Sequence, residues 1–361
     1  MIEAFKESIN SFCSPVAIFT TAIILFSLFV TFPKFMTATP ISAGLGLLLI
    51  FFFAFGITFD RHFREMVSKP DNVPIVGLIF VFGFFTWYAM RKAVMNDALI
   101  AAGKPVREKE ESEEKVMVFP YLIYIEFVVA LLYSAGLVFW SILIKAPLED
   151  PANPALSPNP SKAPWYFLGL QEMLVYFDPW LAGVFFPTLI ILGLCAIPYI
   201  DNDPKTSGYY CFRQRRWGIT TYLAGFWLFW ILLVLMGTFL RGPNWNFFGP
   251  FEEWNIHKLV PLVNVNLSEY FYIKWLGTGL PKNWFLRELP GFAALGVYFS
   301  AIPALLQRTA FKKLYARLSA ARYHILILLT FMMLALPIKM YLRWTLNLKY
   351  IVAIPEFFFN I

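Results

Sequence analysis

The residues that could hold a redox cofactor are few in this sequence, and their positions limit the chemistry they could support. There are three histidines, His62, His257 and His324, and none lies in the middle of an apolar run. A membrane helix bundle that carries a pair of b-type haems needs two histidines for each iron, placed on facing helices. We therefore expect this chain to ligate no haem.

The cysteines give no metal site either. Cys13, Cys195 and Cys211 form neither a CxxC nor a CxxCH motif. Their spacing argues against a zinc site, a thioredoxin-like redox pair and covalently attached c-type haem. No metal ligand is predicted in this chain.

One acidic residue lies within an apolar run and is a candidate for proton chemistry. Glu126 stands about two helical turns inside YLIYIEFVVALL. A carboxylate at the bilayer centre costs roughly 2.5–3.5 kcal/mol on insertion scales, so such a residue usually has a functional or pairing reason. Glu126 could serve a proton path or meet a basic group on a partner. The alternative is a snorkelling or interhelical hydrogen-bonded side chain.

The elements that would position these residues are membrane-spanning helices. The chain is 59% hydrophobic and 15% charged, whereas soluble domains carry about 25% charged residues. About 20 apolar residues cross the hydrocarbon core, and helix is the default because lipid cannot hydrogen-bond an open strand edge. The predicted fold is an all-α integral membrane protein with about eight transmembrane helices, long outer-face loops and no soluble domain. The candidate runs are residues 15–33, 41–59, 74–91, 119–145, 181–200, 218–240, 290–307 and 323–342.

Residues near the ends of these runs have expected roles. Pro74, Pro120 and Pro290 stand at or near first turns, where a missing N–H costs little. Lys339 and Arg343, near the end of the last run, are expected to be interface anchors.

The formal net charge of +7 does not indicate nucleic-acid binding, because the basic residues gather between apolar runs. Such clusters usually mark cytoplasmic loops and can add contact with anionic lipid. The basic loops 201–217 and 308–322 therefore place residues 146–180 and 241–289 on the outer face. The same count puts RHFREMVSK (61–69) outside, against this tendency. Either the N-terminal unit breaks the rule or one of its runs does not cross.

The chain divides into segments of different composition, and REKEESEEK is most simply a solvated linker. We predict an unassigned N-terminal three-helix membrane unit (1–95), a charged linker (96–118), a helical region (119–240) interrupted by a Pro-rich loop (146–180), an aromatic interfacial loop (241–289), and two C-terminal spans with a tail (290–361).

The Pro-rich loop carries the most specific motif in the sequence. It reads DPANPALSPNPSKAPWYFL and leads into GLQEMLVYFDPW, an amphipathic helical stretch that stops at Asp178 and Pro179. Such a loop between two spans resembles the connection between the fifth and sixth helices of cytochrome b. It is equally similar to the matching loop of subunit IV in split cytochrome bf complexes. The resemblance covers roughly residues 115–240, and the chain is more similar to a subunit IV extended at both ends than to a complete cytochrome b.

The resemblance implies that the loop forms one wall of the outer quinol-oxidation site, where the family motif reads Pro-Glu-Trp-Tyr. Trp165 and Tyr166 match the family Trp and Tyr, and with Pro164 and Leu168 they are the candidate quinol-binding residues. Tyr166 would hold its hydroxyl near the ring oxygen. The family Glu is thought to accept a proton during quinol oxidation, and it falls on Pro164 here. A proline cannot accept a proton.

A substitute carboxylate is available in Glu172, eight residues further along the chain. Eight helical residues rise about 12 Å and turn roughly 80°, so Glu172 shares a broad face with position 164 without occupying the same place. Glu172 and Glu126 are the candidate catalytic acids, with Glu126 on a proton path. The alternative for Glu172 is a side chain that faces solvent. Asp178 is a weaker candidate, since Asp-Pro commonly ends a helix.

The favoured function is a haem-free membrane subunit of a respiratory or photosynthetic bc-type complex, completing the outer quinol pocket and its proton exit. As a non-haem subunit of a quinol:cytochrome c oxidoreductase, it would bind quinol or quinone at an interface. The expected partners are a haem b-bearing cytochrome b-like subunit, an iron–sulfur protein or cytochrome c subunit, and the lipid of a bacterial cytoplasmic membrane. The alternatives are a scaffold subunit of a larger redox assembly and a transporter. A transporter is disfavoured because we find no repeat and almost no mid-span charge.

Overall fold

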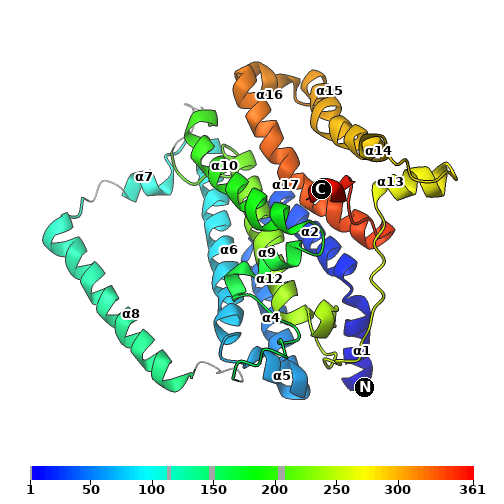
Figure 1. Cartoon of the computed structure of the whole chain (residues 1–361). Helices are drawn as coiled ribbons and strands as arrows, with labels where there is room; N and C mark the ends of the chain where they lie inside the picture. Colours follow the sequence, from blue (N-terminus) through cyan, green and yellow to red (C-terminus); the bar gives the residue numbers. More distant parts are fainter. Residues whose placement is uncertain (1, 112–114, 146–150, 202–207) are drawn as a thin grey trace. The chain divides into compact units, whose positions relative to one another are not determined.

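The structure is a computed structural model that describes residues 2–111, 115–145, 151–201 and 208–361 (Figure 1). Parts of the predicted charged linker, Pro-rich loop and basic loop therefore lie outside the described residues. Regular structure in the described ranges is almost entirely helical. The single sheet there is a hairpin of β1 (Ala353–Ile354) and β2 (Phe359–Asn360).

Seven helices of the described residues are long and apolar enough to cross a membrane. The count reaches eight if α1 (Ile2–Phe12) and α2 (Pro15–Thr31), which are bent by 80°, make one span. The prediction of an all-α integral membrane protein with about eight spans is confirmed. The seven are α4 (Thr39–Phe59), α6 (Val73–Ala101), η1 with α8 (Val118–Leu143), η3 with α10 (Leu181–Ile200), α11 through η5 (Arg216–Leu240), α14 through α15 (Trp284–Arg308) and α17 (Ala320–Leu346).

The bend between α1 and α2 has a local cause. Pro15 has no N–H to donate back into α1, which favours the end of α1 before it. Ser14 has extended backbone angles and its Oγ accepts a hydrogen bond from Ala17 N at 3.1 Å. Ser14 therefore caps a new helix, and the chain changes direction there.

The chain forms two compact units, and each is made of segments that are not contiguous in sequence. The segment boundaries inferred from composition stay a prediction. Unit 1 consists of Met1–Ser161, Lys205–Ala224 and Phe247–Asn255, and unit 2 of Lys162–Pro204, Gly225–Asn246 and Ile256–Ile361.

In unit 1, a buried ion pair joins α1 to the start of α5 (Arg61–Val67). Lys6 Nζ lies 3.1 Å from Asp60 Oδ2, and Asp60 Oδ1 accepts a hydrogen bond from Phe63 N at 2.6 Å. Asp60 is therefore both the N-cap of α5 and one of two counter-ions of Lys6, whose Nζ also lies 3.0 Å from Glu3 Oε1. Gly56 lies beneath the Phe63 ring, which occupies the space that a Cβ would need.

Helix α6 extends beyond the apolar run predicted at 74–91 and reaches Ala101. Asn96 is buried, and its amide donates to Glu108 Oε2 at 2.7 Å and to Tyr210 O at 3.2 Å. The Asp97 carboxylate accepts from Arg213 N at 3.0 and 3.1 Å. These polar contacts within unit 1 hold the end of the helix after its hydrophobic run is over.

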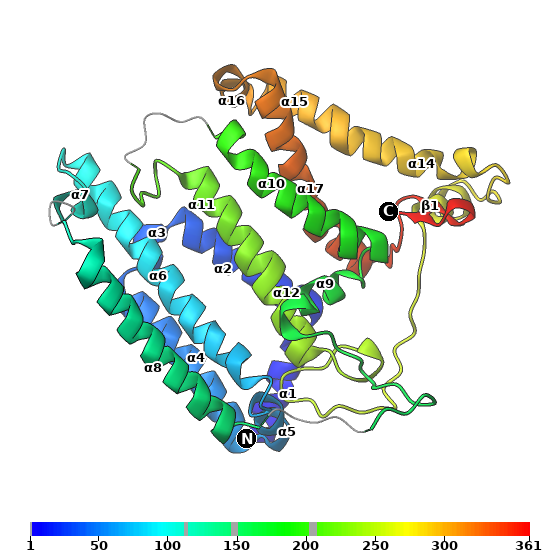
Figure 2. The same cartoon turned by 60° about the vertical axis from the view of Figure 1, so that its left-hand side comes forward.

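In unit 2, helix α9 (Leu168–Met173) packs against α12 (Leu232–Leu235) and η5 (Met236–Leu240), and α10 (Phe186–Ile200) runs beside α17 (Figures 1 and 2). Because α12 and η5 form the C-terminal end of the helix Arg216–Leu240, α9 packs against that end of the helix. The same helix includes wide π-type turns, which are frequent near functional sites.

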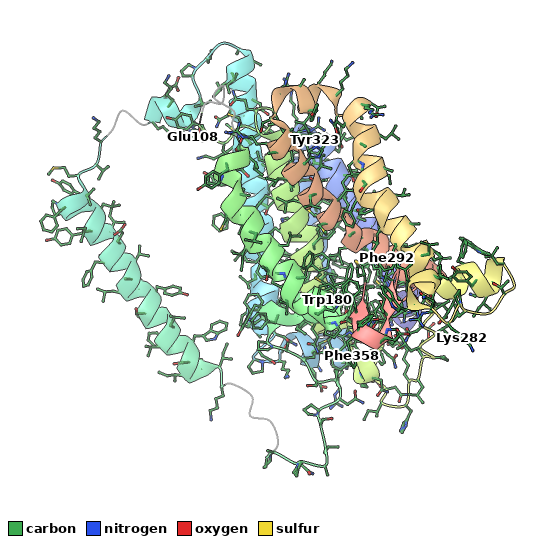
Figure 3. The ribbon with its side chains drawn as sticks, turned by 45° about the horizontal axis from the view of Figure 1, so that its top comes forward. Glu108, Trp180, Lys282, Phe292, Tyr323 and Phe358 are labelled. Atoms are coloured by element: carbon green, nitrogen blue, oxygen red, sulfur yellow. The ribbon has the colours of Figure 1, made fainter. Side chains whose placement is uncertain are left out.

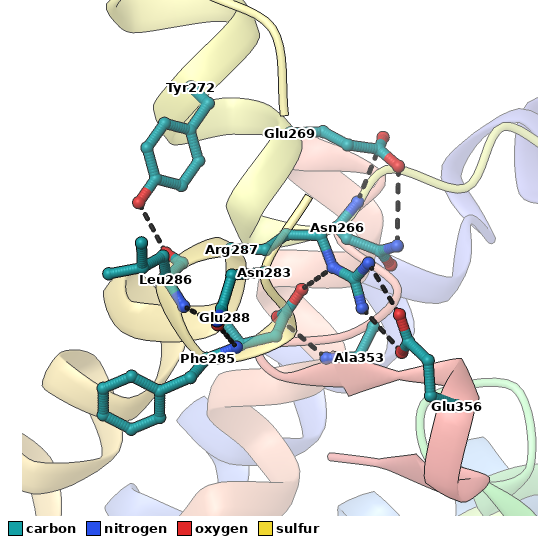
Figure 4. Close-up of polar contacts among 10 residues, drawn as sticks. All are labelled: Asn266, Glu269, Tyr272, Asn283, Phe285, Leu286, Arg287, Glu288, Ala353 and Glu356. Carbon is teal, nitrogen blue, oxygen red and sulfur yellow. Dashed lines mark hydrogen bonds and ion pairs between the residues drawn. The ribbon is translucent and has the colours of Figure 1, made fainter. Parts of the chain in front are cut away.

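The expectation that Pro290 stands at a first turn is wrong. Asn283 caps α14 (Trp284–Gly296) by accepting from Phe285 N and Leu286 N, so the helix begins before the proline. Pro290 has no N–H for the Leu286 carbonyl one turn earlier. The Tyr272 hydroxyl donates to that carbonyl instead, at 2.6 Å (Figure 4). A side chain from the preceding helical segment η7 (Tyr270–Trp275) thus hydrogen-bonds the carbonyl that the proline leaves without a helical donor.

We predict that Asp60→Ala destabilises unit 1 by about 1–3 kcal/mol, because it removes the cap of α5 and one of the two carboxylates that pair with Lys6, the other being Glu3. The control is Arg61→Ala, which breaks the Arg61–Glu65 pair, whose side chains are 82% and 62% exposed. An exposed pair contributes about 0.2–1 kcal/mol. Thermal unfolding of the purified protein in detergent measures both, and equal losses would contradict the assigned role of Asp60.

Candidate functional site

The residues proposed from the APWYF motif lie in one compact turn of unit 2, residues 164–168, which we call the motif turn. Pro164 is followed by η2 (Trp165–Phe167) and then directly by α9. Phe167 N donates to Pro164 O at 2.9 Å, and Ala163 N donates to Gln171 Oε1 at 2.8 Å. The Gln171 side chain therefore ties the start of the motif to the helix that follows it.

This turn is mounted on the end of the helix that runs to Leu240. Trp230 Nε1 donates to Tyr166 O at 3.4 Å, and the Trp165 and Trp230 rings lie 6.3 Å apart. Lys162 Nζ donates to Thr238 O at 2.7 Å. These contacts fix the backbone of the motif along the last three turns of that helix.

Leu168 packs the turn onto the helix rather than facing outward. Its side chain is buried, and a Cβ built on Gly237 would lie 3.3 Å from Leu168 O. A larger residue at position 237 would require the turn or the helix to shift by a few tenths of an ångström. Of the four candidate quinol-binding residues, Leu168 is thus the one that anchors the turn.

The aromatic side chains after Trp165 face outward. Tyr166 and Phe167 are 47% and 51% exposed, and their ring centroids lie 4.6 Å apart. Two adjacent large rings on a rigidly held turn form an apolar contact surface. Such a surface suits a flat aromatic ligand or a partner chain.

Glu172 does not face solvent; it is fully buried in an ion pair with Arg241. Arg241 Nη2 lies 2.6 Å from Oε1, and Arg241 Nε lies 2.9 Å from Oε2. The Tyr176 hydroxyl donates to Oε1 at 3.2 Å. Arg241 Nη1 also donates to Trp245 O at 3.1 Å, which extends the network into the loop after the helix.

The electrostatics of this network favour a charged Arg241 and a neutral Tyr176. Burial by itself lowers the pKa of Arg241, but the charge and hydrogen bonds of Glu172 outweigh it and the pKa is raised above its usual value. Burial raises the pKa of Tyr176 well above its usual value, and the Glu172 charge adds to the rise. Tyr176 therefore stays a neutral donor to Glu172. The arrangement is a bidentate, charge-assisted contact of the strong kind.

Sequence reasoning missed Arg241. Its only local signal is a basic residue directly after a long apolar run, which usually indicates an interface anchor. Glu172 and Arg241 are separated by 69 positions in the chain. Their contact follows from the packing of α9 on the helix end, which no local pattern reveals.

Lys339 and Arg343 are not exposed interface anchors, because both are buried. Lys339 Nζ lies 5.9 Å from the centre of the Phe177 ring and 3.5 Å from Ile361 O. Arg343 Nη1 donates to Val263 O at 2.8 Å and to Asn347 O at 3.0 Å. The loop before the last two spans and the chain after α17 supply these acceptors, so the cations face protein instead of the headgroup region.

Glu126 belongs to unit 1, whereas the other candidate residues belong to unit 2. It lies in α8 (Ile123–Leu143), and all side chains from residue 121 to residue 143 are exposed. A proton path through Glu126 stays a prediction.

The three histidines lie in three different segments of the chain. His62 is in α5 with its ring 5.6 Å from that of Trp254, and His324 is in the second turn of α17 beside Tyr323. His257 lies in the segment between η6 (Pro243–Trp245) and α13 (Leu267–Glu269). Among the residues that the structure describes, no three His, Cys, Asp or Glu side chains are grouped to hold a metal ion.

Residues 151–250 match the family described as cytochrome b(C-terminal)/b6/petD. The matched segment contains the motif turn, α9, α10, the helix ending at Leu240, and Arg241. The resemblance to the C-terminal part of cytochrome b is confirmed for this segment. No solved structure matches the chain significantly.

We predict that Arg241→Gln lowers the local stability of α9 by about 3–5 kcal/mol, because Glu172 is then buried without its counter-ion. The double variant Glu172→Gln/Arg241→Gln should recover most of that loss, since two amides can hydrogen-bond without a buried charge. Hydrogen exchange of the α9 amides measures both variants as opening free energies. Equal losses in the single and double variants would show that the two charges are not coupled.

Proposed function

We propose that this chain, which contains a cytochrome b C-terminal part at residues 151–250, is a haem-free membrane subunit of a bc-type quinol-oxidising complex. It completes the outer-face quinol-oxidation pocket and its proton exit. A haem b-bearing cytochrome b-like subunit forms the other wall of the pocket. An iron–sulfur protein or a cytochrome c subunit receives the electrons, and the complex lies in a bacterial cytoplasmic membrane.

One observation carries the proposal: the family-matched segment holds two outward-facing aromatic rings, Tyr166 and Phe167, on a turn fixed by a buried ion pair. A quinol has a flat ring and an apolar tail, and it releases protons as it is oxidised. Its site therefore needs an apolar wall and a group that accepts or relays a proton. The Tyr166–Phe167 surface supplies the wall, with the Tyr166 hydroxyl at its edge.

The role of Glu172 as the proton acceptor stays a prediction. In the arrangement described, Arg241 and Tyr176 already occupy both carboxylate oxygens of Glu172. To take up a proton, the carboxylate would first give up part of this network. The geometry therefore favours Glu172 as a positioning residue that holds the turn, with proton transfer as the second possibility.

Tyr166→Leu should reduce kcat/KM for quinol oxidation by roughly tenfold, about 1.4 kcal/mol, because it removes an aromatic contact and the hydroxyl from the wall. The measurement is quinol-dependent reduction of the acceptor by the complex purified from membranes. Tyr199→Leu is the matched control, since Tyr199 is 76% exposed at the other end of α10. A scaffold subunit would leave quinol oxidation unchanged in both variants.

Glu172→Gln should slow quinol oxidation without loss of assembly, and the pH profile separates the two roles. If Glu172 accepts a proton, the acidic limb of the rate profile disappears or shifts. If it positions the turn, the rate falls by the same factor at every pH and the α9 amides exchange faster. The exposed Glu253→Gln is the control, and turnover unchanged across pH would exclude Glu172 as the proton acceptor.

The purified chain, separated from its partners, should show no b-type haem absorbance, because none of its three histidines lies in the middle of an apolar run. The measurement is a reduced-minus-oxidised difference spectrum of the isolated subunit and of the whole complex. A stoichiometric haem b signal in the isolated subunit would overturn the assignment of the haems to a partner.

A further inference from the structure

The end of the chain folds back as a small hairpin that we call the C-terminal strap, residues 351–361. It contains β1, a short turn at η9 (Pro355–Phe357), and β2. Ile361 N donates to Val352 O at 2.9 Å, and Ile351 N donates to Ile361 O at 2.6 Å. The strap is therefore closed on itself by backbone hydrogen bonds.

One side of the strap is clamped to α14 by charged groups (Figure 4). Arg287 binds Glu356 with two hydrogen bonds of 3.1 and 2.8 Å, and its Nε donates to Glu288 Oε1 at 3.1 Å. The buried Glu288 carboxylate also accepts from Ala353 N at 2.9 Å. Glu288 thus joins the strap backbone to the arginine that holds its turn.

The same side of the strap fits closely onto α14. A Cβ at Gly291 would collide with the carbonyl oxygen of Ile351, so the strap backbone lies directly on the helix. Val352, Ala353 and Ile354 are buried. The strap is a packed part of unit 2 and not a free tail.

The other side of the strap reaches the chain just after the motif turn. Asn360 Nδ2 donates to Asp178 Oδ2 at 3.1 Å, and Trp180 Nε1 donates to Asn360 O at 3.0 Å. The Trp180 ring stacks on Phe359, with centroids 5.4 Å apart and planes tilted by 29°. Figure 3 shows Trp180 next to the strap, with Phe358 on the strap turn.

Asp178 and Trp180 mark the point where the segment carrying α9 meets the next span. Asp178 O accepts from Leu181 N and Ala182 N, which begins that span. The buried side chains just before it, Tyr176 and Phe177, lead back to Glu172. The segment is therefore held at two points: the Glu172–Arg241 pair on one side and the strap on the other.

We propose that the C-terminal strap sets the position of the motif turn through Asp178 and Trp180, so that it is a positioning element for quinol binding. This inference rests on the proposed function. The hydrogen bonds of Arg287 and Glu288 hold the strap at a fixed position on α14. The contacts of Asn360 with Asp178 and of Phe359 with Trp180 then fix the end of the segment that carries α9. Residues at the end of the chain thereby control the geometry of a surface nearly two hundred positions earlier, a separation of 180 between Trp180 and Asn360.

The test uses the complex purified from membranes with the double variant Trp180→Phe/Asn360→Ala. It removes the hydrogen bonds that the Trp180 and Asn360 side chains make between the strap and the α9 segment, and it keeps an aromatic ring at position 180 to stack on Phe359. Loss of two hydrogen bonds predicts roughly thirtyfold faster hydrogen exchange over residues 168–177, which corresponds to about 2 kcal/mol. We also expect KM for quinol to rise several-fold, with kcat changed less. Phe358→Asn is the matched control, since Phe358 is 90% exposed on the same strap with φ of 51°, a conformation that asparagine tolerates.

Exchange that stays unchanged in the double variant would overturn the inference, as would faster exchange with unchanged KM. An equal effect from Phe358→Asn would also overturn it, because that side chain touches neither Asp178 nor Trp180 among the described contacts. If the unaltered complex oxidises no quinol, the proposed function fails. The exchange data then still decide whether the strap holds the α9 segment.

Discussion

The buried pair of Glu172 and Arg241 is the interaction on which the rest of unit 2 depends. A carboxylate and a guanidinium in a low-dielectric interior are stable there only with good geometry and satisfied hydrogen bonds. Here Tyr176 and the Trp245 carbonyl take up remaining hydrogen-bonding capacity. The pair fixes α9 against the end of the helix at Leu240. The outward direction of the Tyr166 and Phe167 rings follows from that constraint.

Equally apolar helices in this chain have very different surroundings. In the most apolar 18-residue window of the helix Arg216–Leu240, 44% of residues are buried inside the protein, whereas in Val118–Leu143 none is. Hydropathy reports whether a helix is compatible with lipid, not whether it packs against protein. The helix that supports the motif turn uses its apolar surface for internal packing. The helix that carries Glu126 leaves its surface for lipid or other chains.

Much of the fold could be predicted from the sequence, because span length and composition are local properties. Trp165 and Tyr166 could also be selected from the local sequence motif, and they lie together on one turn. The partner of Glu172 could not be found, since the contact joins distant segments through helix packing. The same holds for Lys339 and Arg343, whose burial depends on a chain segment that follows their helix. The position of Pro290 inside its helix could not be predicted, because the hydrogen bond that the proline removes is replaced by one from the Tyr272 hydroxyl in η7.

The Tyr272–Leu286 hydrogen bond has a consequence for how this sequence can change over generations. The hydroxyl is needed only while position 290 is a proline that leaves the Leu286 carbonyl without its helical donor. Exchange of Pro290 for an ordinary helix-forming residue would restore that donor and free position 272 to drift. Loss of the tyrosine first would leave that carbonyl without its hydrogen-bond donor. The order of the two substitutions is therefore constrained, and relatives of this chain should carry the proline only where they also carry a donor at position 272.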